Sequence, residues 1–172
     1  MQQVKLGSNI LTPCGPLFWP VEVGLGCIAP DYRSLDPPPI HMGVVVKEAD
    51  DPIIFEGCFP RARLVPLSTH PDYRVVNWLS ESPGQDHVDE FVRTRLGDRY
   101  DFACYTWTVL SRWLKLPFPR IYNGLFTCWE IAAEFALWCG EPWANYWEWP
   151  LITDLLKAAG VIGEDNDEEK RN

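Results

Sequence analysis

The hydrophobic pattern of this chain changes its period near Val88, from the alternation typical of strands to the spacing typical of helices. Before this point, "HMGVVV" and "PIIFEGCF" predict two strands, joined into a hairpin by "KEADD". Further strand is expected at 21–29, and at 62–79 with an interruption by a proline-containing loop. After it, the spacing and end signals predict helices in "HVDEFVRTRLG", "DFACYTWTVLSRWLKL" and "CWEIAAEFALW", with a last short helix over 151–159. Strands followed by helices indicate an α+β domain.

Length and composition predict one folded unit. Of the 172 residues, 47% are hydrophobic, which is enough for one core and too little for two comfortable domains. We expect a single domain over 1–163, in which the Pro- and Gly-containing residues 1–20 form an irregular N-terminal segment. The last stretch, 164–172 ("EDNDEEKRN"), predicts a disordered acidic tail.

Charge and apolar runs exclude several classes of partner. The formal net charge is −9 and no clustered basic face is evident, so we expect no binding to nucleic acid. No apolar run is long enough for a membrane-spanning helix or for a signal peptide. We therefore expect no transmembrane segment and, as encoded, a cytoplasmic protein.

The cysteines show no metal-binding spacing. The sequence has no C-x-x-C pair and no histidine at ligand spacing to a cysteine. We expect no metal and no cofactor, and without a signal peptide we expect free thiols rather than disulfides. The six cysteines are Cys14, Cys27, Cys58, Cys104, Cys128 and Cys139.

One of these cysteines stands at a predicted helix start. In "FTCWEIAAEFALWCG", Thr127 and Glu130 have the spacing of a capping box, which makes Cys128 the first helical residue. Unpaired N–H groups and the helix dipole favour a thiolate at that position, and a thiolate is the nucleophilic form. The alternative is that Cys128 is a small buried hydrophobic residue, as many free cysteines are.

A nucleophilic cysteine needs a base, and the sequence offers three histidines. His70 lies between Thr69 and Pro71 in a predicted loop, and His87 stands beside a helix start, where a capping or surface role suffices. His41 opens a β-branched run and is therefore placed on a strand that would hold it rigidly. His41 is the candidate base.

The hairpin brings a carboxylate into range of His41 in some registers. If Gly43 faces Glu56, then His41 faces Cys58 and all four side-chain positions share one face of the sheet. Another register sets His41 directly opposite Glu56, and a slip by one residue would send Glu56 to the other face. In the first two cases Glu56 can accept the imidazole N–H and orient the ring. The alternative is an exposed strand glutamate beside a satisfied histidine.

The order "HMGVVV", "FEG", "RYDF" and "LFTCWEIAAEF" resembles circularly permuted papain-like cysteine hydrolases of the YiiX/YebB kind, relatives of the NlpC-type cell-wall peptidases. In this permuted group the histidine strand precedes the cysteine, as it does here. The resemblance covers roughly 20–140 and implies an antiparallel sheet or barrel packed against a helical subdomain. It also implies Cys128 as the nucleophile, His41 as the general base and Glu56 as the orienting residue.

Three further residues belong to the matching motifs. Tyr100 and Asp101 match a "YDF" element that these families place beside the site, although Asp101 is equally explained as a helix N-cap. Trp129 stands where the family commonly has serine after the cysteine, so it would narrow the cleft or supply a stacking wall. The segment 142–150 ("PWANYWEWP") has no counterpart in the family and serves either specificity or the core.

The function that the resemblance implies is a cysteine hydrolase that cleaves an amide bond through an acyl-enzyme. The expected substrate is a cell-wall (peptidoglycan) peptide, which would suit a bacterial, phage or virion-associated protein. The alternatives are a lipid or acyl-ester hydrolase or acyltransferase, and a binding or virion-structural module in which the same residues are unused.

Overall fold

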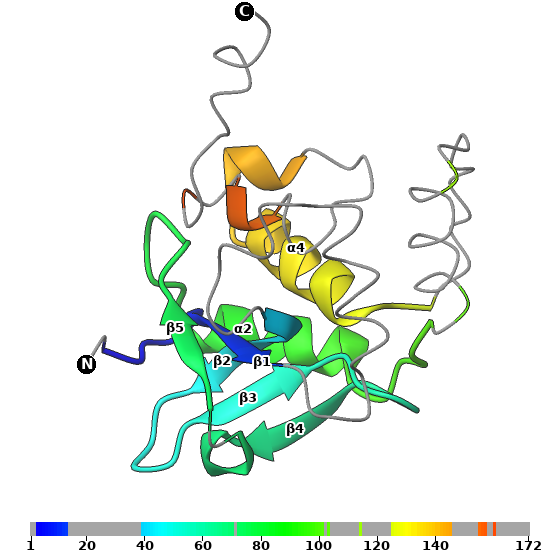
Figure 1. The fold of residues 1–172 in the computed structure, drawn as a ribbon. Helices are drawn as coiled ribbons and strands as arrows, with labels where there is room; N and C mark the ends of the chain where they lie inside the picture. The colour runs from blue at the N-terminus through cyan, green and yellow to red at the C-terminus, as the bar shows by residue number, and fades with distance from the viewer. Residues whose placement is uncertain are drawn as a thin grey trace, which may run out of the picture.

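A computed structural model describes residues 3–13, 39–70, 72–101, 103, 114, 125–145, 155–157 and 160. The described part is α+β, with an open five-stranded antiparallel sheet and a few helices (Figure 1). The strands are β1 (Asn9–Pro13), β2 (Pro39–Lys47), β3 (Ile53–Glu56), β4 (Arg63–Pro66) and β5 (Arg74–Val76), in the order β4-β3-β2-β1-β5. The described helices include η3 (Leu67–Thr69), α2 (Gln85–Arg95), α4 (Cys128–Trp138) and η4 (Pro142–Asn145), and residues 155–157 are also helical.

The predicted hairpin is formed by β2 and β3. Gly43 faces Glu56 and Val45 faces Ile54, which is the first of the registers considered above. The register shifts by a bulge between Val45 and Lys47, next to the turn. His41 is therefore the diagonal neighbour of Glu56 on the same face of the sheet.

The two faces of the sheet bury different clusters. On one face, alternate residues of the hairpin such as Val44 and Phe55 pack into the main core with α2 and α4 (Figure 1). Phe91 of α2 links the layers, because its ring contacts both Phe55 and Phe135. On the other face, which carries His41 and Glu56, a smaller cluster is covered by η3; it comprises Ile10, Val45, Ile54 and Leu67.

The start of α4 and the ends of α2 and α4 lie where the sequence signals predict, whereas α2 begins at Gln85, two residues before the predicted start at His87. The capping box of α4 is present, with the Thr127 hydroxyl accepting from the Glu130 N–H and the Glu130 carboxylate accepting from the Thr127 N–H. Gly140 follows the end of α4 with φ 83°, and Gly97 follows α2 with φ 86°, left-handed conformations that favour glycine. The expected strand over 62–79 is also confirmed as β4 and β5, interrupted by η3 and a loop.

The N-terminal segment differs from the prediction. Residues 1–20 are not irregular throughout, because β1 lies within them and pairs with both β2 and β5. Leu11 packs into the main core on one face of the sheet and Ile10 into the smaller cluster on the other, so both are buried and the sequence shows no alternation. The strand expected at 21–29, most of the helix after Asp101, the ends of the helix over 151–159 and the tail 164–172 lie outside the described residues.

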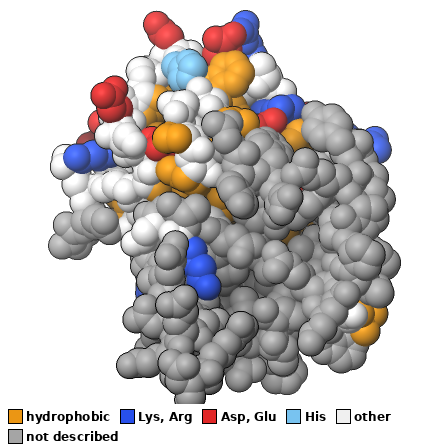
Figure 2. All heavy atoms as spheres, turned by 90° about the horizontal axis from the view of Figure 1, so that it is seen from above, with side chains coloured by type: hydrophobic (Ala, Val, Ile, Leu, Met, Phe, Trp, Pro, Cys, Tyr) orange, Lys and Arg blue, Asp and Glu red, His pale blue; other side chains and the backbone are white. Residues whose placement is uncertain are grey.

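The described surface carries charges of both signs. Seen from above, acidic and basic side chains lie side by side along one edge, with hydrophobic side chains between them (Figure 2). In the described part of the chain, no helix combines the length and the apolar character that crossing a membrane requires.

Candidate active site

Three elements bring the expected residues together. His41 lies near the start of β2, Glu56 is the last residue of β3, and Cys128 is the first residue of α4. Nε2 of His41 lies 2.7 Å from Oε2 of Glu56, and the Glu56 side chain is only 1% exposed. Cys128 lies close enough to His41 for its sulfur to contribute to the raised pKa of the imidazole. Since Nε2 is occupied by Glu56, the ring nitrogen that remains for the Cys128 sulfur is Nδ1.

The protonation states of His41 and Glu56 follow from the contacts of their side chains. Burial alone would lower the pKa of His41, but hydrogen bonds and charge interactions with Cys128 and Glu56 outweigh it and raise the pKa to about 10. For the carboxyl of Glu56 burial acts in the opposite direction and would raise the pKa. The hydrogen bond with His41, together with the interactions with Arg63 and His70, outweighs burial and lowers the pKa of Glu56 to about 2. Glu56 is therefore a carboxylate at neutral pH, and His41 Nε2 donates to it.

A glycine allows the helix to approach the hairpin. A Cβ on Gly57 would lie 3.1 Å from the Cα of Cys128, 3.1 Å from the carbonyl oxygen of Thr127 and 2.9 Å from Cδ1 of Ile131. The chain immediately after Glu56 is thus in direct contact with the first turn of α4. A side chain at this position would separate the cysteine from the His41 strand.

Two residues at the site were not identified from the sequence. Nε of Arg63 donates to Oε1 of Glu56 at 2.8 Å, and Nε2 of His70 lies 3.0 Å from Oε2. Arg63 faces Glu56 directly across β3 and β4, so extending the strand register from the hairpin would have found it. No local signal identifies His70, because its place depends on how η3 docks.

The three supporting residues predicted from the motifs, Tyr100, Asp101 and Trp129, have different positions relative to Cys128. The Asp101 N–H donates to the carbonyl of Phe126 at 3.0 Å, and Tyr100 pairs with Phe126, so this segment runs beside the approach to Cys128. Asp101 is buried; the helix it was expected to cap lies largely outside the described residues. Trp129 is buried in the main core, which is a packing position rather than an exposed wall of a cleft.

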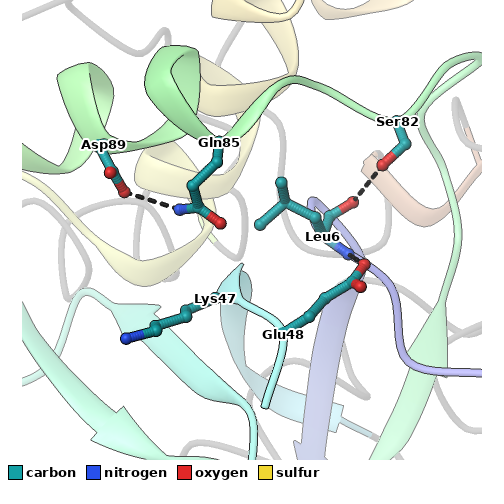
Figure 3. Close-up of a pocket in the computed structure, with 6 residues that line it drawn as sticks. All are labelled: Leu6, Lys47, Glu48, Ser82, Gln85 and Asp89. Carbon is teal, nitrogen blue, oxygen red and sulfur yellow. Dashed lines mark hydrogen bonds between the residues drawn. The ribbon is translucent and has the colours of Figure 1, made fainter.

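A surface pocket of about 530 Å³ lies elsewhere (Figure 3). None of the residues that line it belongs to the Cys128, His41 and Glu56 group. Its polar groups largely satisfy one another: Glu48 accepts from the Leu6 N–H, and Gln85 donates to Asp89. The lining residues are Leu6, Lys47, Glu48, Ser82, Gln85 and Asp89.

Within the described ranges, no group of three or more His, Cys, Asp or Glu side chains has an arrangement that could hold a metal ion. Comparison with protein-family models and with curated proteins finds no match to this chain. The assignment of chemistry to the site therefore depends on its geometry and on the residue motifs.

The contact at Gly57 leads to a prediction for Gly57→Ala. The added methyl group meets the backbone of Thr127 and Cys128, so α4 must shift and the free energy of unfolding should fall by about 1–3 kcal/mol. Urea denaturation measures this change. Gly84→Ala is the control, because a Cβ there meets nothing within 4 Å and its φ is −70°. Equal stability of the two variants would contradict the close contact.

The pKa shifts predict how stability depends on pH. The folded-state pKa of Glu56 is about 2 against an ordinary 4.5, so its contribution is complete above pH 4.5 and is lost as the pH falls towards 2. The folded-state pKa of His41 is about 10 against 6.5, so its contribution is complete below pH 6.5 and is lost as the pH rises towards 10. The acid loss from Glu56 is on the order of 3 kcal/mol.

Urea denaturation between pH 2 and 6 tests this dependence. The free energy of unfolding of the wild type should fall more steeply with acid than that of Glu56→Gln, which has no carboxylate to titrate at this position. Asp50→Asn, in the exposed turn of the same hairpin, should keep the wild-type slope. Parallel slopes for wild type and Glu56→Gln would show that the pKa of Glu56 is not depressed in the folded protein.

Proposed function

We propose that this protein is a cysteine hydrolase with a permuted papain-like arrangement, which cleaves an amide bond through an acyl-enzyme. The observation that supports the proposal is the His41 ring, which contacts the Glu56 carboxylate at 2.7 Å and lies close enough to Cys128 for the sulfur to raise the pKa of the ring. A nucleophile, a base and a group that orients the base are the three parts that this chemistry needs.

The reaction begins from a thiolate–imidazolium pair, in which the proton of the Cys128 sulfur is already held on Nδ1 of His41. Its raised pKa favours holding that proton, and Glu56 stabilises the imidazolium through Nε2. The thiolate attacks the carbonyl carbon, and the oxyanion meets the N–H of Cys128, which as the first helical residue has no partner within α4.

Collapse of the tetrahedral intermediate breaks the C–N bond. His41 gives its proton to the leaving amine, and the acyl group remains on Cys128 as a thioester. Water then attacks the thioester while His41 accepts its proton. The acid product leaves, and the Cys128 and His41 pair is restored.

The substrate class follows from the motif resemblance: a peptide of the bacterial cell wall, with a bacterial or phage source. A second candidate is a binding or virion-structural module in which these residues are unused. The observation that favours it is the 2% exposure of Cys128, which a small core residue would also show. The two candidates differ in the reactivity of the thiol.

Alkylation by iodoacetamide at pH 6, mapped by peptide mass spectrometry, separates the candidates. We expect Cys128 to react faster than the more exposed Cys58 and Cys139, because the imidazolium of His41 stabilises its thiolate. Cys139 is a matched internal control, since burial and Glu141 raise its pKa to about 11. His41→Ala should remove the difference. A Cys128 that reacts more slowly than Cys58 would favour the unused module.

The role of Glu56 predicts the kinetics of Glu56→Gln. The amide can keep the hydrogen bond to His41 but removes the negative charge that stabilises the imidazolium. We expect kcat to fall by about 100-fold or more with little change in KM, because the interaction strengthens as the imidazolium forms. The assay is hydrolysis of the first amide or ester substrate with Cys128-dependent turnover, and Asp50→Asn is the control. Equal activity of the two variants would remove Glu56 from the mechanism.

A further inference from the structure

The Glu56 carboxylate has more partners than the proposed mechanism uses. Oε1 accepts from Arg63, and Oε2 contacts both His41 and His70, at 2.7 and 3.0 Å. The two histidine rings lie with their centroids 6.0 Å apart. One carboxylate oxygen is therefore shared by two imidazoles that come from different parts of the chain.

The contact at His70 requires a hydrogen on Nε2. Glu56 is a carboxylate at neutral pH, and an imidazole lone pair 3.0 Å from a carboxylate oxygen would be repelled. Nε2 of His70 is buried, and its 3.0 Å approach to Oε2 of Glu56 does not have the geometry of a hydrogen bond; within the described part of the chain it has no other partner. Its only polar neighbour at ion-pair distance there is Oε2 of Glu56.

The backbone holds His70 in this position. Leu67 of η3 is buried in the smaller cluster, and its N–H donates to the carbonyl of Pro52, the residue before β3, at 2.7 Å. Ser68 is anchored to Asp51 through both its N–H and its hydroxyl, at 3.0 and 2.6 Å. The His70 N–H then closes the turn on the Leu67 carbonyl at 2.9 Å.

Arg63 and His70 contact Glu56 from environments that differ in their exposure to solvent. Its side chain is 54% exposed, whereas that of His70 is 17% exposed. A long exposed side chain loses more rotamer freedom when it is fixed, and solvent competes for its hydrogen bonds. Solvent therefore screens the Arg63 contact more than the His70 contact, although the Arg63 contact has hydrogen-bond geometry.

We propose that His70 is a positioning residue of this site, whose Nε2–H shares Oε2 of Glu56 with His41 and fixes the carboxylate that orients the His41 ring. The inference rests on the proposed function in so far as His41 is the base. His70 itself does not contact the reacting atoms; it acts through Glu56.

The role of His70 can be tested with His70→Gln and His70→Asn, which both place an amide at this position but differ in side-chain length. The side-chain amide of His70→Gln extends about as far as Nε2 and can still donate to Oε2, whereas the shorter amide of His70→Asn cannot. Neither can carry a charge. We expect iodoacetamide alkylation of Cys128 at pH 6 to slow by about tenfold in His70→Asn and to stay within about threefold of wild type in His70→Gln, consistent with the loss of one hydrogen bond to a charged group.

The control is His87→Asn, because His87 contacts Trp138 and lies away from Glu56. This variant should alkylate at the wild-type rate. Wild-type reactivity in His70→Asn would overturn the inference. Equal loss in His70→Asn and His70→Gln would also overturn it, because the ring would then act by its charge or by packing.

NMR titration of the His41 ring keeps the inference testable without a reactive thiol. In His70→Asn the Glu56 carboxylate loses its contact with residue 70 and is less firmly held beside His41, so the pKa of His41 should fall. In His70→Gln the contact is kept and the pKa of His41 should not change. If Cys128 is inert in the wild type, the proposed hydrolase function fails while this titration still decides the role of His70. Identical His41 titrations in the two variants would overturn the inference.

Discussion

The buried carboxylate of Glu56 is the interaction on which the site depends. A charge that is 1% exposed costs several kcal/mol unless it is paired and hydrogen-bonded. Here the partners come from three elements: His41 from β2, Arg63 from β4 and His70 from the end of η3. A single side chain at the end of β3 thus ties together both neighbouring strands and the segment that covers the sheet.

The contacts of the Glu56 carboxylate with its several partners are energetically coupled. Removing one donor leaves the same desolvated carboxylate with fewer bonds, so the remaining contacts carry more of its stabilisation. The effects of substitutions at His41, Arg63 and His70 should therefore not be additive. Beside them on the same face of the sheet, Ile54 and Leu67 exclude water, which makes the pairing both strong when complete and costly when incomplete.

Local signals were sufficient for part of the site. The turn length and the alternating pattern limited the hairpin to a few registers, including the observed pairing of Gly43 with Glu56. The capping box placed Cys128 at the first position of α4 because its two hydrogen bonds lie within four residues. The place of His70 could not be predicted, since it depends on where Leu67 is buried, and the two-sided burial of β1 removed the alternation that identifies a strand.

The cysteine and the histidine are brought together by backbone contacts between distant segments. Gly57 lies against the Cα of Cys128, and residues 97–101 run between 60–62 and Phe126, with hydrogen bonds to both. The first contact sets the distance between the hairpin and α4, and the second fixes the chain that leads into the helix. Neither contact requires the cysteine to precede the histidine in the sequence. The same geometry is therefore compatible with either chain order, which is why a base on β2 can come before a nucleophile on α4 without any change in the chemistry proposed for them.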